Sequence, residues 1–208
     1  MGIWREQVVP RATDKVLDTG EVRRLRTEAV AGLAGEVVEI GFGSGLNVRC
    51  YPPGVSRVLA VEPSQVARRL AAGRVGRSGV PVEFVGLDAQ GLRLGSASAD
   101  SALSTFTLCT VPDPGRALDE LMRVLRPGGT FHFLEHGLSP VAGVARWQRR
   151  LDPVQSRIAA GCHLDRDVEG LVRDAGFVVD RIRNEEMRGP RVLRPLAYLY
   201  LGVATKPV

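Results

Sequence analysis

The sequence predicts an α/β fold, a Rossmann-like, mostly parallel sheet of seven strands with helices on both faces. Three observations predict it: strand-like and helix-like segments alternate five times, two late strand-like runs follow, and a glycine-rich turn follows the first strand. Parallel strands need crossover connections, which are almost always right-handed. The 208 residues suit a single domain over 1–208, with residues 1–33 as a helical segment covering the site and 34–208 as the core.

Short runs of apolar and β-branched residues between turn residues predict the strands. They lie at about 36–40, 57–61, 82–85, 101–107, 130–134, 177–183 and 196–204. Apolar residues at helical spacing predict the helices. These lie at about 19–33, from near 45 to before 51, and at about 65–74, 113–125, 141–160 and 165–175. Ser64 is expected to cap the helix that follows it.

The first strand runs into a glycine-rich turn. Gly41, Gly43 and Gly45 stand at alternate positions, and Glu62 follows 17 residues after the last of them, at the end of the second strand. Glycine permits positive φ and lets a ligand approach the backbone closely. A carboxylate after the second strand can accept hydrogen bonds from a ribose diol. The pattern therefore predicts a nucleotide-binding site beyond the carboxyl ends of the strands.

The spacing of the glycines distinguishes two classes of ligand. The dinucleotide fingerprint G-x-G-x-x-G would need its third glycine where Leu46 stands. An NAD-dependent oxidoreductase is therefore a disfavoured alternative, and the chain length leaves it little room for a separate substrate domain. Preceded by Glu39, the G-x-G-x-G pattern resembles motif I of the class I methyltransferases that use S-adenosylmethionine (SAM).

Further motifs extend this resemblance. Leu125-Arg126-Pro127-Gly128-Gly129 looks like the L-[RK]-P-G-G motif of many class I methyltransferases, including the quinone-biosynthesis C-methyltransferases. From about residue 39 to 204 the chain is similar to the methyltransferase-like thiol S-methyltransferases of animals and their bacterial relatives. The motifs that carry this similarity are Tyr51-Pro52-Pro53-Gly54, Thr105-Phe106-Thr107-Leu108-Cys109-Thr110-Val111, Glu135-His136, Trp147-Gln148, Leu151-Asp152-Pro153 and Gly161-Cys162-His163-Leu164.

The resemblance implies a SAM-dependent enzyme that acts on a small, lipophilic acceptor and releases S-adenosylhomocysteine. A thiol is one candidate acceptor, and a phospholipid amine, a phenol and a ring carbon are others. A non-catalytic SAM-binding protein is a further alternative. The animal members carry an N-terminal apolar anchor, whereas residues 1–7 are too polar here even for a signal peptide, so membrane attachment is not expected to carry over.

The resemblance also implies which residues bind SAM. The glycine turn is expected under the methionine part, and Glu39 is expected to order that turn through backbone N–H groups and to face the ligand's ammonium. Glu62 is expected on the ribose and Pro63 against the adenine. Asp88 is expected near the adenine amino group, or as a turn residue that caps its own loop. The full expected set is Glu39, Gly41, Phe42, Gly43, Ser44, Gly45, Asn47, Glu62, Pro63, Asp88, Ala89, Thr105 and Leu108.

His136 and His163 are the candidate catalytic residues. A thiol acceptor must lose its proton, because the thiolate is the nucleophile. His136 follows the fifth strand, and His163 lies in the motif 161–164 shared with the thiol methyltransferases. Capping or packing is the alternative role for both histidines. His132, inside that strand, is expected to be structural, and Cys109 to act as a small buried hydrophobe.

Composition limits the partners and the location. The net charge of +5 reflects scattered arginines without interleaved aromatic residues, so we expect no nucleic acid partner, while weak attraction to an anionic lipid surface stays open. Cys50, Cys109 and Cys162 are widely spaced and include no C-x-x-C pair. We therefore expect neither a disulfide framework nor a metal site, and a reducing cytoplasm. No apolar run reaches membrane-spanning length.

Overall fold

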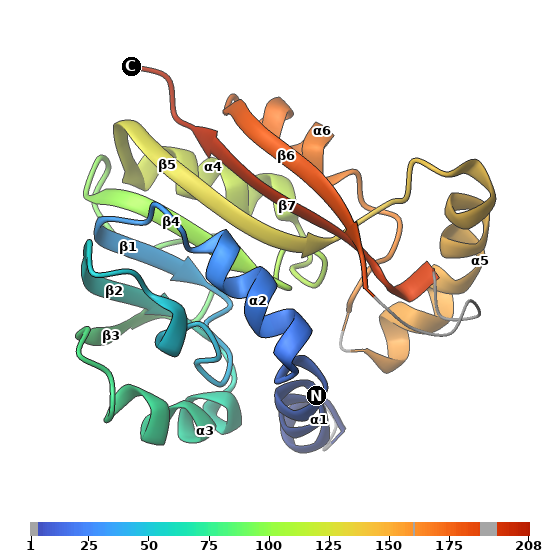
Figure 1. Cartoon of the computed structure of the whole chain (residues 1–208), viewed down its shortest axis with the longest axis horizontal. Helices are drawn as coiled ribbons and strands as arrows, with labels where there is room; N and C mark the ends of the chain where they lie inside the picture. Colours follow the sequence, from blue (N-terminus) through green and yellow to red (C-terminus); the bar gives the residue numbers. More distant parts are fainter. Residues whose placement is uncertain (1–3, 160, 188–194) are drawn as a thin grey trace.

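The computed structural model describes residues 4–159, 161–187 and 195–208 and contains a seven-stranded sheet (Figure 1). Its strand order is β3-β2-β1-β4-β5-β7-β6, in which the first five strands pair in parallel and β7 runs antiparallel between β5 and β6. The strands are β1 Gly35–Ile40, β2 Val55–Val61, β3 Val82–Gly86, β4 Ala99–Thr105, β5 Leu125–His136, β6 Val178–Glu186 and β7 Tyr198–Thr205. The predicted fold class is confirmed.

Helices connect the strands and cover both faces of the sheet. They are α1 Val9–Leu17, α2 Gly20–Ala29, α3 Gln65–Val75, α4 Pro114–Val124, α5 Ala142–Ile158 and α6 Val168–Asp174, with a π-helical turn, η1 Trp4–Val8, before α1. Figure 1 shows α2 in front of the sheet and α4 and α6 behind it. Ser64 caps α3 as predicted, because its hydroxyl accepts a hydrogen bond from the N–H of Ala67. Within the described ranges, no helix combines the length and the apolar character needed to cross a bilayer.

Apolar contacts hold the helices on the two faces. Leu118 and Leu121 of α4 are fully buried in the larger core, which also contains residues of α6. On the opposite face Leu25 of α2 is buried with Leu134 of β5. Burial of a leucine side chain contributes about 1.5–3 kcal/mol, so each helix is fixed to the sheet by its apolar stripe.

One predicted helix is wrong. Between Gly45 and Tyr51 the chain forms only a 3₁₀ turn, η2 Val48–Cys50. Gly45 and the two alternate glycines before it all have positive φ, which keeps the backbone out of the right-handed helical region. A Pro-Pro pair follows Tyr51 and restricts the residue before it to an extended conformation. Too few residues remain between these constraints for an α-helix.

The strand order reverses between β1 and β4. Strand β1 pairs with β2 on one side and with β4 on the other, so the chain leaves the ends of β1 and β4 in opposite directions. The register pairs Ile40 with Ser104, which places the glycine turn beside the loop that follows Thr105. Ligands of open α/β sheets bind in the crevice at such a reversal.

Candidate functional site

A cavity of about 380 Å³ lies beyond the carboxyl ends of β1, β2 and β4. Its volume falls within the roughly 300–1,000 Å³ of small-molecule sites. Of the residues predicted to bind SAM, those that line it are Gly41, Phe42, Gly43, Ser44, Glu62, Pro63, Asp88, Ala89 and Thr105. The other four, Glu39, Gly45, Asn47 and Leu108, are not part of its lining. Leu108 is fully buried in the core instead.

The alternate glycines have different local surroundings. A Cβ atom on Gly41 would lie 1.9 Å from Oγ1 of Thr107, so only glycine allows the two loops to approach. Gly43 lines the cavity, and a Cβ atom on it would have nothing nearer than a carbonyl oxygen at 3.7 Å. The φ angle of Gly43 is +59°, a value that β-branched residues rarely adopt. The turn therefore uses its first glycine for packing and its second for ligand space.

The carboxylate of Glu62 lies at the cavity wall and holds the glycine turn. It accepts hydrogen bonds from the N–H of Gly43 (2.8 Å) and the N–H of Ser64 (2.6 Å). Burial raises the pKa of Glu62, while these two N–H groups oppose the shift. Asp88 is exposed, and it accepts from the N–H of Gln90 at 2.9 Å, which is the turn-capping contact expected as the alternative role.

A buried polar network lies beneath the turn. Glu39 accepts from Nδ2 of Asn47 (2.9 Å) and from the hydroxyl of Tyr51, so it holds two side chains and not the backbone N–H groups expected from the sequence. The same Nδ2 atom also lies 2.9 Å from Oγ1 of Thr105. Burial raises the pKa of Glu39 to about 7, against the hydrogen bonds from Tyr51 and Asn47 and the positive charge of Arg26.

Arg26 of α2 completes this network, and sequence reasoning missed it. Its Nη1 donates to Oδ1 of Asn47 and to Oγ1 of Thr105, both at 2.8 Å. The side chain is 5% exposed and lines the cavity, and its Nε atom has no hydrogen-bond partner among the described residues. Burial lowers the pKa of Arg26 to about 10. The available signal was its place in the inward stripe of α2, between Leu25 and Ala29.

Helix α1 closes one side of the cavity. Asp14 accepts from the hydroxyl of Ser44 (2.6 Å) and from Nη1 of Arg74 (2.8 Å), so α1 is tied to the glycine turn and to α3. Val9 and Leu17 of the same helix line the cavity. The division into a helical segment, residues 1–33, and a core, residues 34–208, stays a prediction. These contacts show how α1 is held against the core.

Glu135 fixes the loop after β4. Its fully buried carboxylate accepts from the hydroxyl of Ser104 (2.6 Å), the N–H of Thr107 (2.8 Å) and the N–H of Cys109 (3.4 Å). Phe106 in this loop has a positive φ of 54°, a strained value for an aromatic residue. Phe106 and Thr107 line the cavity, so Glu135 positions cavity walls without being part of them.

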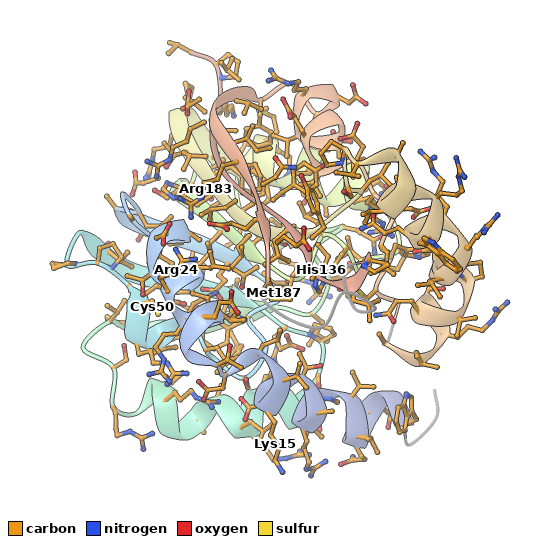
Figure 2. The ribbon with its side chains drawn as sticks, turned by 45° about the vertical axis from the view of Figure 1, so that its right-hand side comes forward. Lys15, Arg24, Cys50, His136, Arg183 and Met187 are labelled. Carbon is orange, nitrogen blue, oxygen red and sulfur yellow. The ribbon has the colours of Figure 1, made fainter. Side chains whose placement is uncertain are left out.

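The two candidate catalytic histidines lie outside the cavity lining. His136 is the last residue of β5 and is partly buried (Figure 2). Its ring packs edge-on against Phe106 at 5.3 Å between centroids. Nδ1 of His163 lies 2.8 Å from Oδ2 of Asp152, which forms a histidine–carboxylate pair. His132 bonds the carbonyl oxygen of Ala29 in the interior, as expected for a structural residue.

Comparisons with known proteins agree with this geometry. Residues 38–133 match a family model described as "Methyltransferase domain". The chain is 34% identical over 181 residues to the thiol S-methyltransferase TMT1B of Rattus norvegicus, covering 84% of this chain and 73% of that protein. It is 29% identical over 157 residues to a phosphatidylethanolamine N-methyltransferase of Cereibacter sphaeroides, covering 74% and 76%. A solved SAM-dependent methyltransferase structure from Methanosarcina mazei superposes with a TM-score of 0.63 at 24% identity, covering 83% and 92%, which shows the shared fold.

Gly43→Val is expected to reduce SAM affinity by about a hundredfold or more, because the new side chain fills ligand space. Gly128→Val is the matched control: Gly128 also has positive φ and has nothing within 4 Å of its Cβ position, but it lies outside the cavity. Both variants carry similar backbone strain of about 1–2 kcal/mol. Calorimetric titration with SAM, after thermal melts confirm folding, measures the difference. Equal affinities in the two variants would remove the glycine turn from the ligand site.

Proposed function

Because this chain belongs to the class I methyltransferases that use SAM, we propose that it transfers the SAM methyl group to a small, lipophilic acceptor and that this acceptor is a thiol. The observation that carries the choice of thiol is the similarity to thiol S-methyltransferases over most of the chain. Membership in a family of methyltransferases argues against the two alternative functions, an NAD-dependent oxidoreductase and a non-catalytic SAM-binding protein.

The lining of the cavity supports a lipophilic acceptor. Apolar residues of three separate segments form part of the walls: Val9, Pro10, Leu17, Val111, Pro112 and Ala159. Such a surface favours an acceptor with a hydrocarbon body, because its burial removes apolar area from water. Of the charged lining residues, Arg26, Glu62 and Asp88 are among the groups that we assign to SAM, and Asp14 is bound to Ser44 and Arg74.

The residues at the strand ends fit SAM. Glu62 has lone pairs left for the ribose hydroxyls beyond the two N–H groups that it accepts. Arg26 offers a buried Nε–H without a partner among the described residues, and we assign it to the carboxylate of the methionine part. Bound SAM supplies a methyl group activated by its sulfonium. The chain's own contribution is then to hold the acceptor in line with it, since oriented reactants gain up to about 7–11 kcal/mol.

His163 is the better supported of the two candidate bases. Its Nδ1 faces Asp152, and the carboxylate stabilises the tautomer that carries the proton there. Nε2 is then the ring atom that can accept a proton from an acceptor thiol. His136 instead directs Nδ1 toward the sulfur of Cys162. Both histidines remain proposals, and positioning is proposed to matter more than either.

An exposed surface of α5 supports weak contact with anionic lipid. Trp147, Val154 and Ile158 are each more than half exposed on this helix. Arginines at 146, 149, 150 and 157 share the same helix, and Arg150 stacks on the ring of Trp147. Apolar and basic side chains together are typical of helices that lie at a membrane surface. A phospholipid amine is therefore the second candidate acceptor, which the relationship to a phosphatidylethanolamine N-methyltransferase also favours.

Glu62→Ala is expected to weaken SAM and S-adenosylhomocysteine equally, by roughly ten- to several-hundredfold, because each hydrogen bond to a carboxylate contributes about 1.5–3 kcal/mol. Asp88→Ala is the control and should cost less, since Asp88 is exposed and already caps its own turn. Titration of both compounds into both variants measures the two losses. An affinity within about twofold of the parent in Glu62→Ala would show that this carboxylate does not hold the ribose.

Incubation with SAM and a panel of alkyl thiols, phospholipid amines, phenols and quinols is expected to yield the thioether as the main product, detected by mass spectrometry. The rate should rise with pH toward the thiol pKa of about 8.5, since the thiolate reacts. His163→Ala should lower kcat about tenfold, with Asp152→Asn showing a smaller effect. Methylated amine without thioether would contradict the thiol acceptor and favour the second candidate.

Sedimentation with vesicles is expected to recover the protein on anionic phospholipid at low ionic strength, and to release it as salt screens the arginines. Trp147→Ser should weaken this binding, because its ring supplies the largest exposed apolar surface of α5. Val178→Ser is the control, since Val178 is equally exposed but lies on the edge strand β6. Binding that survives high salt, or equal loss in both variants, would contradict this surface.

A further inference from the structure

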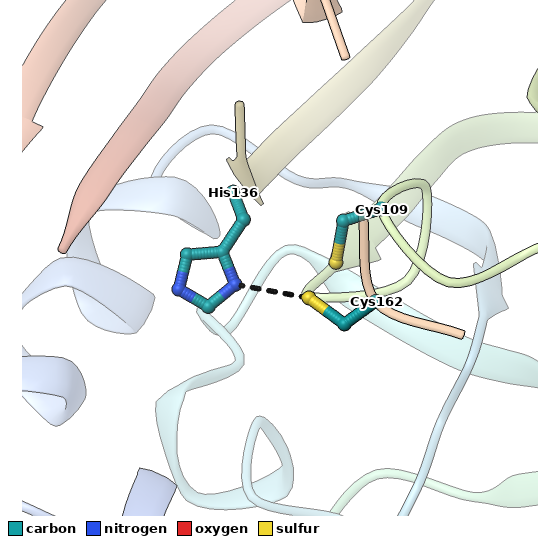
Figure 3. Close-up of side chains that lie close together, drawn as sticks. All are labelled: Cys109, His136 and Cys162. Carbon is teal, nitrogen blue, oxygen red and sulfur yellow. Dashed lines mark hydrogen bonds between the residues drawn. The ribbon is translucent and has the colours of Figure 1, made fainter. Parts of the chain in front are cut away.

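Two of the three cysteines and one histidine meet beside the cavity. Cys109 follows β4, His136 ends β5 and Cys162 follows α5, yet their two sulfurs and one ring nitrogen all lie within 4.8 Å of one another (Figure 3). The sulfur of Cys162 lies 3.7 Å from Nδ1 of His136. Three strand and helix ends thus assemble a soft donor set that the spacing of the cysteines along the chain does not reveal.

Neither packing nor capping accounts for this cluster. Cys109 and Cys162 are 1% and 7% exposed, but they contact each other and an imidazole, whereas inert buried thiols lie among apolar groups. Among the described residues, Nε2 of His136 is buried without a partner, and Nδ1 has only Cys162. The ring therefore caps no backbone group.

We propose that Cys109 Sγ, Cys162 Sγ and His136 Nδ1 form a binding site for a thiophilic divalent metal ion, Zn²⁺. Zinc bonds of about 2.3 Å to sulfur and about 2.0–2.1 Å to nitrogen, at tetrahedral angles, place a sulfur and a nitrogen about 3.6 Å apart and two sulfurs about 3.8 Å apart. The observed 3.7 Å between Cys162 and His136 matches the first distance. The third ligand is already within reach at less than 4.8 Å.

The three donors leave one coordination position of a tetrahedral zinc ion open. No fourth histidine, cysteine or carboxylate joins the cluster within the described ranges. Three protein ligands with an exchangeable fourth position are typical of catalytic zinc, whereas structural zinc is closed by four. Phe106 packs on His136 and also lines the cavity. Thr107 and Thr110, which precede and follow Cys109 in the chain, line the cavity too. The inference about the fourth coordination position rests on the proposed thiol acceptor. This position would hold either water or the thiolate of the acceptor, because a thiol that binds zinc loses its proton.

The test is metal binding by the full chain under reducing conditions, measured by competition with a chromogenic chelator and by Co²⁺ absorbance. We expect one equivalent of Zn²⁺, an affinity that rises with pH as thiol protons are displaced, and a thiolate-to-cobalt charge-transfer band. Cys109→Ser, Cys162→Ser and His136→Ala should each weaken binding by about tenfold or more. Cys50→Ser is the control, since Cys50 is the third cysteine of the chain and does not belong to this cluster.

The parent protein decides the outcome even if a variant fails to fold. Absence of stoichiometric Zn²⁺ binding, or binding that Cys50→Ser weakens as much as Cys162→Ser does, overturns the site. SAM titration of the same samples keeps the two proposals apart: intact SAM affinity without zinc removes only the metal site. Addition of a small alkyl thiol to the cobalt protein should intensify the charge-transfer band, and an unchanged spectrum would overturn the open position.

Discussion

The position of the cavity depends on one buried cation. Arg26 donates to Asn47 and Thr105, and this pair of hydrogen bonds joins α2, the turn after β1 and the end of β4 at the reversal of the sheet. Loss of the guanidinium would leave the buried Oδ1 atom of Asn47 unsatisfied, at a cost of about 1–3 kcal/mol, whereas Oγ1 of Thr105 would keep its contact with Asn47. Apolar packing of Leu25 alone would fix the helix to the sheet but would not join the turn after β1 to the end of β4.

The network carries two charges that lack direct contact. Glu39 is the negative member, and Asn47 stands between it and Arg26 with its amide group bonded to both. Burial disfavours the charged form of each group, so it raises the pKa of Glu39 to about 7 and lowers the pKa of Arg26 to about 10. Removal of either partner from such a pair is costly, because it strands the other charge. Of the two charged groups only Arg26 lines the cavity, so the guanidinium is the member of the pair that a ligand can reach.

Local signals predicted what local residues build. The glycine turn, the acids at 39 and 62 and the cap at Ser64 each follow from a few adjacent residues, so the fold and the walls nearest the nucleotide could be predicted. The prediction of a helix after Gly45 was wrong, because the glycines at its start have positive φ angles that an α-helix does not allow. Arg26 and Tyr51 were missed because their partners lie on other elements, and only the inward face of α2 carried a hint of the former.

The contrast between residues that are close in sequence and residues on distant elements also applies to the two parts of the proposed site, the nucleotide part and the acceptor part. The residues that we assign to the nucleotide come mainly from the ends of consecutive strands, whereas the residues that we assign to the acceptor come from α1, the loop after β4 and the segment after α5. Glu135 fixes the loop after β4, because it holds Thr107, which lines the cavity, and Cys109, which belongs to the cluster with Cys162 and His136. A shift of that carboxylate would therefore move a wall of the cavity and a member of the cluster together. One buried acid at the end of β5 thus makes this cavity wall and the cluster depend on the same sheet edge.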